Sequence, residues 1–327
     1  MARMARVAVA QMAPVFMDRA RTVAKICDWV ARAGREGVRV VVFPEAIVPG
    51  YPYWTRCIDV QSSAARNRLL YEQALVMESD DVQRIAHAAR AAGTAVVFGA
   101  TELGGRTLYC SQVFISAEGR LLGVRRKLMP TQHERMVWGM GDGRDLQVHT
   151  LPEGRIGGLI CFEHSNPLYC YGVLGQGEDF HAALWPGGMW TINGIVDAAI
   201  RHYAFQAQCF VLCATSLMTP EILEALGDEG SVREFLRPGN GASAIVSPRG
   251  SYLAPPRPDE EALLIADANL DDIIDLKITV DSAGHYARPD VLSLHVRRGA
   301  QRPLVFDSGP AAWQPPPDSH DPHDGPA

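Results

Sequence analysis

Apolar and polar residues alternate along the chain with two periods, one typical of strands and the other of helices. Residues 5–12 and 39–43 are short runs of small and β-branched apolar residues, which predict buried strands. Between these runs, apolar side chains from Val23 to Val30 recur at the i, i+3, i+4, i+7 spacing of one helix face. The order of strand, helix and strand is typical of α/β layers.

The alternation continues through most of the chain. Residues 79–93 combine a Ser-Asp start, an apolar stripe and a terminal glycine, which predict a helix before a strand at 94–100. A hairpin is predicted at 107–124 and a further helix at 196–208. Further strands are predicted at 155–160, 181–185, 210–216, 243–247 and 262–270. We expect a mixed sheet whose apolar strands are covered on both faces. Helices would cover one face, and the other leaves room for a second sheet.

These elements predict one layered α/β domain over residues 1–303. Residues 304–327 are rich in Pro, Asp and Gly, and we expect a disordered tail there because little of it can be buried. His320 and His323 in this tail are interpreted as solvated side chains rather than as metal ligands. The stretch 218–238 is a candidate lid or subunit contact, with a plain surface loop as the favoured interpretation.

Composition narrows the class of protein without naming an activity. Of the 327 residues, 47% are hydrophobic and 21% are charged, and the formal net charge is −6, so no basic surplus points to nucleic acid. The apolar runs are far shorter than the ~20 residues that a membrane-spanning helix needs. The N-terminus lacks a secretory h-region, so we expect a cytoplasmic protein. Seven cysteines without paired spacing favour neither disulfides nor a zinc site.

Three polar residues stand where the sequence around them is strand-like. Glu45 follows VVVFP, Lys127 follows GRLLGVRR, and Cys161 follows GGLI. Because ligand crevices of α/β sheets form beyond the carboxyl ends of strands, these side chains are candidates for one cleft. Taken singly, each has a plainer interpretation: Glu45 as a loop acid, Lys127 as a solvated lysine and Cys161 as a buried thiol.

Together the three residue types make a coherent nucleophile site. A cysteine with its ordinary pKa near 8.5 is only a few per cent thiolate at pH 7, so it needs a base and a nearby positive charge. Glu45 would supply the base and Lys127 the charge. A charge pair 4 Å apart in a partly desolvated cleft interacts by about 4 kcal/mol, which would favour an ionised thiolate that burial disfavours.

Three motifs, which stand in the family's order along the chain, resemble signatures of the nitrilase family. GVRVVVFPEAIVPGYP (37–52) resembles its first signature, and GGLICFEHSNPL (157–168) resembles the one that holds the nucleophile. KLMPTQHERMVWGMGDG (127–143) is similar to the stretch with the family's lysine and additional glutamate. The likeness covers about residues 5–298. It implies a four-layer α-β-β-α sandwich, an enzyme without a cofactor, and dimers that assemble into spirals or filaments.

The resemblance also implies roles for individual residues. Cys161 would be the nucleophile, Glu45 the general base, and Lys127 the cation that stabilises the tetrahedral intermediate. Glu134 would orient the substrate or the lysine. Among the aromatic residues, Tyr51, Phe162 and Trp185 are favoured for the substrate pocket by their motif neighbours.

The chain departs from the family's pattern at two positions. Phe162 stands where the family usually has tryptophan, and Cys170 replaces a basic residue. Phe162 keeps an aromatic wall and its backbone N–H, so we expect an altered pocket shape rather than lost chemistry. The departures leave the substrate range open.

The expected activity is hydrolysis of an organic nitrile to a carboxylic acid and ammonia. The alternatives are an amidase or carbamoyl hydrolase with the same Glu-Lys-Cys triad, or a nitrilase that degrades cyanide. Related amide-cleaving branches more often carry aspartate two residues after the cysteine, whereas this chain has Glu163, which favours nitriles. A filament-forming structural protein without activity is the non-enzyme alternative, against which the intact triad argues.

Overall fold

The computed structural model describes residues 3–227 and 230–299. The predicted tail at 304–327, with His320 and His323, lies outside the described residues, so the proposed domain boundary at 303 stays a prediction. The described strands form two six-stranded sheets.

The first sheet is mixed and contains the N-terminal strands. Its parallel centre is β1–β2–β3, and β12, β4 and β5 are antiparallel to their neighbours. Its strand order is β12 (Ala262–Asn269), β1 (Met4–Gln11), β2 (Val40–Val42), β3 (Ala95–Gly104), β4 (Thr107–Ile115) and β5 (Leu121–Arg126). The predicted mixed sheet and the predicted hairpin are confirmed.

The second sheet has a similar plan. Its parallel centre is β7–β8–β9, and β6, β10 and β11 are antiparallel to their neighbours. Its strand order is β11 (Tyr252–Ala254), β10 (Ala244–Val246), β9 (Phe210–Thr215), β8 (Phe180–Trp185), β7 (Gly154–Ile160) and β6 (His149–Leu151).

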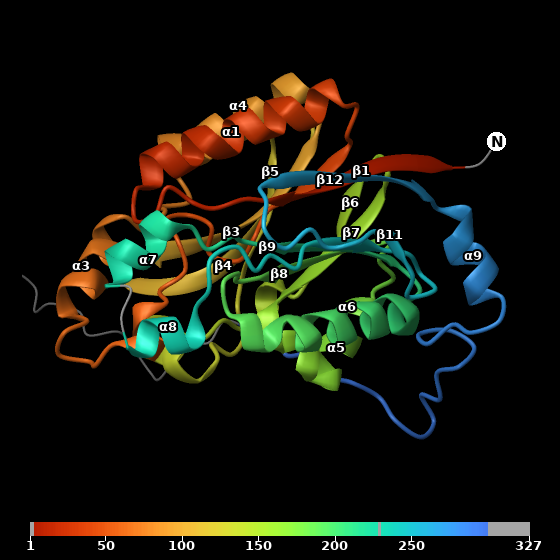
Figure 1. The fold of residues 1–327 in the computed structure, drawn as a ribbon. Helices are drawn as coiled ribbons and strands as arrows, with labels where there is room; N and C mark the ends of the chain where they lie inside the picture. The colour runs from red at the N-terminus through yellow and green to blue at the C-terminus, as the bar shows by residue number, and fades with distance from the viewer. Residues whose placement is uncertain (1–2, 228–229, 300–327) are drawn as a thin grey trace, which may run out of the picture.

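The sheets pack face to face, and helices cover both outer faces. The helices α1 (Arg19–Arg35) and α4 (Asp80–Ala92) lie over the first sheet, whereas α5 (Pro167–Leu174) and α6 (Asn193–Ala207) lie over the second (Figure 1). This arrangement is the four-layer α-β-β-α sandwich that the resemblance implied. Shorter helices complete the described chain: α2 (Trp54–Cys57), α3 (Ala64–Glu72), α7 (Pro220–Leu226), α8 (Ser231–Phe235), α9 (Asp271–Lys277), and the 3-10 turns η1 (Gln132–Met136), η2 (Gly143–Asp145), η3 (Cys161–Ser165) and η4 (Trp190–Ile192).

Alternate side chains of the central strands enter two different cores. Val40 and Val42 of β2 pack between the sheets in one cluster with Phe210 of β9. Val41 points the other way, into the cluster that holds Ile26 of α1. Successive strand residues face opposite sides of a sheet, so a strand buried on both sides must be apolar throughout, which explains the run VVVF.

The stretch 218–238 is not the plain surface loop that we expected. It contains α7 and α8, and the side chains of Ile222, Leu226 and Val232 are buried in the core cluster next to α6. Thr219 caps α7 through its hydroxyl, and Gly227 ends it at a φ of 95°. The sequence pattern did not predict these helices, because they are short and their few apolar residues lie within a polar stretch.

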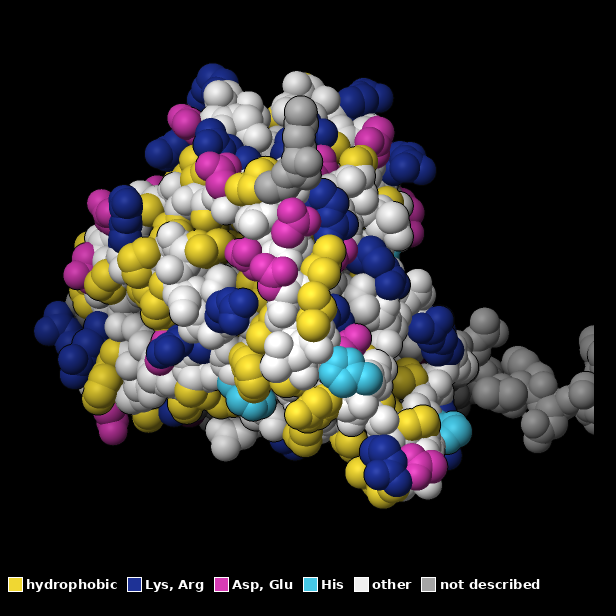
Figure 2. Space-filling view, turned by 90° about the vertical axis from the view of Figure 1, so that its right-hand side faces the viewer, with side chains coloured by type: hydrophobic (Ala, Val, Ile, Leu, Met, Phe, Trp, Pro, Cys, Tyr) yellow, Lys and Arg dark blue, Asp and Glu magenta, His cyan; other side chains and the backbone are white. Residues whose placement is uncertain are grey.

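No helix among the described residues is long and apolar enough to cross a membrane. The face that carries α9 shows basic and acidic side chains interspersed with apolar ones (Figure 2). That face therefore lacks the broad basic patch by which proteins bind nucleic acid.

Candidate active site

The structure brings Glu45, Lys127 and Cys161 together between the ends of the two sheets. Glu45 follows β2 and Lys127 follows β5 in the first sheet, whereas Cys161 directly follows β7 in the second. A carboxylate oxygen of Glu45, a carboxylate oxygen of Glu134 and the sulfur of Cys161 lie within 4.8 Å of one another. Gly99 of β3 allows the loop at Glu45 to approach, because a Cβ there would lie 2.5 Å from the Ala46 nitrogen.

Lys127 is fully buried and bound by two carboxylates. Its Nζ donates to Glu45 Oε1 at 2.8 Å and to Glu134 Oε2 at 2.8 Å. Burial lowers the pKa of Lys127, but the charges of Glu134 and Glu45 outweigh burial and raise it well above its usual value. Lys127 is therefore a permanent ammonium, and the interpretation as a solvated lysine is wrong.

One carboxylate oxygen of Glu45 accepts hydrogen bonds, whereas the other has no hydrogen-bond partner. Oε1 accepts from Lys127 and, at 3.5 Å, from the Cys110 thiol. Oε2 is buried without a hydrogen-bond partner. Burial raises the pKa of Glu45 to about 7, although Lys127 opposes this shift. A carboxylate with this pKa and a free oxygen has the properties of a general base near neutral pH.

Cys161 is held in an unusual backbone conformation at the start of η3. Its φ is 55°, in the left-handed region that side chains other than glycine rarely adopt. Burial and the nearby Glu45 raise the pKa of the Cys161 thiol well above its usual value, while Lys127 and the Phe162 backbone N–H lower it less. Because Lys127 is already shared by two carboxylates, the structure favours a resting thiol over the thiolate that the sequence reasoning expected.

Glu134 is fixed by three hydrogen bonds. Oε2 accepts from Lys127 and, at 2.6 Å, from the Thr131 backbone N–H, while Oε1 accepts from the Tyr51 hydroxyl at 2.7 Å. Tyr51 therefore positions Glu134 as well as lining the pocket. The sequence had suggested only that Tyr51 lines the pocket.

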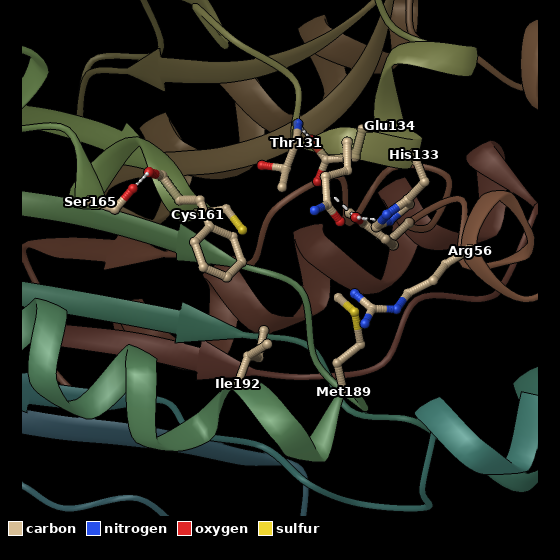
Figure 3. A pocket seen from close by; sticks show the side chains of 11 residues that line it. Arg56, Thr131, His133, Glu134, Cys161, Ser165, Met189 and Ile192 are labelled. Carbon is tan, nitrogen blue, oxygen red and sulfur yellow. Dashed lines mark hydrogen bonds between the residues drawn. The ribbon is translucent and has the colours of Figure 1, made fainter.

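A pocket of about 330 Å³ opens onto the sulfur of Cys161 (Figure 3). Tyr51, Phe162, Met189 and Ile192 give it apolar walls, and Arg56, Thr131, Gln132, His133, Glu134 and Ser165 also line it. Trp185 does not line this pocket. Trp185 packs behind Phe162, which is a pocket wall. The two rings meet edge-on with centroids 5.7 Å apart, and Trp185 also stacks on His164.

A buried ion pair that the sequence reasoning missed holds the lysine and cysteine segments together. Arg125 donates to both carboxylate oxygens of Glu163, at 3.0 and 2.6 Å. Glu163 also accepts from the backbone N–H groups of Leu128 and Ile160, each at 2.7 Å. Glu163 thus links the segment after β5 to the end of β7 rather than facing the pocket. The sequence signal that could have revealed this pair is a charged residue three positions after the end of a buried strand.

The arrangement of donor atoms does not favour a metal. Glu45, Glu134 and Cys161 could in principle ligate an ion, but the Lys127 ammonium already binds both carboxylates at 2.8 Å. An added cation would face this fixed positive charge. The absence of a cofactor stays a prediction.

Comparison with known proteins agrees with this geometry. The chain is 40% identical over 308 residues to an aliphatic nitrilase of Rhodococcus rhodochrous, which covers 91% of this chain and 84% of that protein. It is 38% identical over 298 residues to a nitrilase of Pseudomonas syringae, with 88% of each covered. It is 36% identical over 315 residues to an arylacetonitrilase of Aspergillus kawachii, and the match covers 92% of this chain and 94% of that protein.

Solved structures share the fold at low sequence identity. A carbon-nitrogen hydrolase from Helicobacter pylori matches with a TM-score of 0.72 and 16% identity, covering 88% of this chain and 96% of that one. An amidase from a Nesterenkonia species matches with a TM-score of 0.63 and 20% identity, and the match covers 83% of this chain and 92% of that one. The model of the carbon-nitrogen hydrolase family matches residues 6–278. The chain therefore belongs to the carbon-nitrogen hydrolase family.

Proposed function

We propose that this enzyme is a nitrilase, which converts an organic nitrile and two waters to a carboxylic acid and ammonia. The observation that carries the proposal is that a carboxylate oxygen of Glu45 lies within 4.8 Å of the Cys161 sulfur, while Lys127 binds Oε1 of Glu45 and Oε2 has no hydrogen-bond partner. Relatives that share 36–40% of their residues with most of this chain are named nitrilases, which favours nitriles over amides.

The first step forms a covalent thioimidate. Cys161 Sγ attacks the nitrile carbon while Glu45 Oε2 takes the thiol proton and passes it to the nitrile nitrogen, so that one C–S bond forms and one C–N π bond breaks. The Phe162 N–H lies against the sulfur and lowers the pKa of its thiol. Charge therefore develops next to donors that are already in place, which lowers the cost of reorganisation.

The second stage releases ammonia and then the acid. A water loses a proton to Glu45 and adds to the thioimidate carbon, giving a tetrahedral species that Lys127 stabilises. Protonation of its nitrogen lets ammonia leave and gives a thioester, which a second water hydrolyses. If the nitrogen is not protonated, the thiolate leaves instead and an amide is released, so we expect acid with a minor amide product.

A panel of nitriles and the corresponding amides, assayed for ammonia, tests the proposal. Cys161→Ala should abolish ammonia release, whereas Cys213→Ala, a buried cysteine in β9, should retain it. Ammonia from amides alone would favour the amidase alternative, in which the same triad attacks a carbonyl. Well-folded protein that releases no ammonia and whose Cys161 resists alkylation would favour the structural alternative.

We further propose that the enzyme is a cytoplasmic homo-oligomer, and the resemblance to the nitrilase family supports the assembly. Light scattering of the purified full chain tests the assembly, and a monomer at all concentrations would contradict it. Cell fractionation tests the location.

A further inference from the structure

The mouth of the pocket carries two arginines that form no ion pair with any of the described residues. Arg56 lines the pocket, and Arg135 lines an adjoining hollow of about 220 Å³ that shares Thr131, Gln132, Phe162 and Ser165 with it. The two carboxylates in these walls are already paired: Glu134 binds Lys127, and Glu163 binds Arg125.

Arg56 is the arginine that faces the substrate space. Figure 3 shows it reaching into the pocket from the side away from Cys161. Its guanidinium lies 4.5 Å from the centre of the Phe235 ring, which holds the side chain from behind. Among residues 3–227 and 230–299, its side chain makes no hydrogen bond or ion pair. Five N–H donors are therefore available to a ligand.

From this we infer that the substrate is a nitrile with an anionic group, such as a carboxylate, at the end remote from the nitrile. This inference rests on the proposed nitrilase activity. With the nitrile carbon at Cys161, the far end of an elongated substrate meets Arg56, and a planar guanidinium pairs with a carboxylate through charge-assisted hydrogen bonds. The apolar walls between the two ends suit a methylene chain.

Matched substrates test this class. We would measure kcat and KM for ammonia release from ω-cyanoalkanoates and from ω-cyanoalkanols of equal chain length. The acid of the best length should have at least a tenfold higher kcat/KM than its alcohol. Arg56→Gln should remove most of this preference through KM, because one charged hydrogen-bonded contact contributes about 1.5–3 kcal/mol. Arg35→Gln, an exposed arginine in α1, controls for net charge.

The outcomes separate this inference from the proposed function. Equal kcat/KM for acids and alcohols, or an unchanged preference in Arg56→Gln, would overturn the anionic substrate and leave the nitrilase intact. If neither series releases ammonia while other nitriles of the panel do, the anionic aliphatic class is wrong and the nitrilase stands. If no nitrile releases ammonia, the proposed function itself is wrong. Added salt should weaken the preference, because the contact lies at the exposed mouth.

A second, independent observation lies behind Cys161. His164 Nδ1 is 2.8 Å from the Cys161 carbonyl oxygen, and His164 Nε2 is 3.0 Å from His181 Nε2. His181 Nδ1 is 3.0 Å from Glu178, which also accepts from the Tyr203 hydroxyl. All four side chains are buried, and a Cβ at Gly157 would lie 2.3 Å from Glu178 Oε2, so glycine leaves room for this carboxyl.

The partners fix the direction of the two hydrogen bonds that His164 makes. A carbonyl oxygen only accepts, so His164 Nδ1 must carry a proton and donate to Cys161. Burial, with the nearby His181, lowers the pKa of His164 well below its usual value, so its Nε2 is bare and must accept from His181. Glu178 and His181 Nδ1 then share one proton, and Tyr203 donates to Glu178.

We propose that His181, Glu178 and Tyr203 act as positioning residues, which keep His164 donating to the Cys161 carbonyl. Cys161 has a φ of 55°, a conformation that costs about 1–3 kcal/mol unless its surroundings hold it. Anchoring the carbonyl fixes the peptide plane from which the sulfur and the Phe162 N–H project. These residues do not contact substrate, so the effect should appear in kcat rather than in KM.

Two substitutions of similar size distinguish this role from simple packing. In His181→Gln the amide NH2 can still donate to both His164 and Glu178, whereas His181→Met can donate to neither. We expect His181→Gln to keep kcat within about threefold of wild type and His181→Met to lower it at least tenfold, with KM unchanged in both. Thermal unfolding of the two variants measures stability separately.

Histidine ¹⁵N NMR reports the same arrangement directly. Wild type should show His164 protonated at Nδ1 and bare at Nε2 from pH 6 to 9. A proton on Nε2 would overturn the proposed direction. Equal kcat for the Gln and Met variants would show that His181 acts only by filling space.

Discussion

At the scale of single residues, the reactivity of Cys161 depends on atoms that its neighbours supply. Burial and the nearby Glu45 raise the pKa of its thiol, which favours the protonated sulfur. Reactivity therefore requires Glu45 to remove the proton during attack. Glu45 can do so because one of its oxygens has no hydrogen-bond partner and because burial raises its pKa to about 7.

The pH dependence of catalysis follows from Glu45. Its pKa of about 7 is raised by burial, so the basic, ionised form is populated only as pH rises through neutrality. We expect kcat/KM to fall about tenfold per pH unit well below pH 7 and to level off above it. The measurement is a pH profile at constant ionic strength. A plateau that continues down to pH 5 would contradict Glu45 as the base.

Removing the lysine should harm both stability and activity. Lys127→Met leaves Glu45 and Glu134 buried without their shared cation, and breaking such a pair typically costs about 3–5 kcal/mol. Loss of one donor to the tetrahedral species should lower kcat by about 10²–10³. Urea unfolding and initial rates measure the two effects. An active, equally stable variant would exclude the role proposed for Lys127.

At the scale of elements, the site depends on how strand ends of two sheets are tied together. Arg125 belongs to β5 and Glu163 to η3, so their bidentate pair fixes the lysine strand relative to the cysteine strand. The neighbouring pair of Arg126 and Glu102 lies within the first sheet and is partly exposed. The two pairs offer a matched comparison.

Glu163→Gln should therefore cost more than Glu102→Gln. The first leaves the Arg125 guanidinium buried without a carboxylate, which should lower the free energy of unfolding by roughly 3 kcal/mol. The second weakens a partly exposed pair, and we expect about 1 kcal/mol or less. Urea unfolding measures both. Equal costs would mean that the pair between the sheets has no special part in holding the site.

The sequence predicted these elements unevenly, for physical reasons. Strands such as β2 were found because burial on both faces makes them apolar throughout. Glu45 and Cys161 were found because a polar or reactive residue ends such a run. The role of Glu178 was not found, because its partners His181 and Tyr203 lie on separate elements. The helix α8 is only five residues long, which is little more than one helical turn and too short for a repeated apolar pattern.

At the scale of the whole molecule, the C-terminal segment packs on the outer helices rather than on the site. Leu294 and Val296 lie next to Gly172 of α5, and Ser282 bonds to Gln208 at the end of α6. These contacts follow the region that matches the family model, which ends at residue 278. Residues 279–299 therefore add cover to α5 and α6 without adding to the pocket.

Two truncations should separate this segment from the tail beyond it. A chain that ends at residue 303 should keep its kcat and its unfolding midpoint, because the Pro-rich sequence after it has little to bury. A chain that ends at residue 278 loses the apolar contacts at α5 and the hydrogen bonds to Gln208, and it should unfold at lower urea concentration. Urea unfolding and ammonia release would be measured on both. If ending the chain at 303 already lowered stability or activity, the domain boundary proposed there would be wrong. If ending it at 278 left the unfolding midpoint unchanged, residues 279–299 would contribute little to holding α5 and α6 in place.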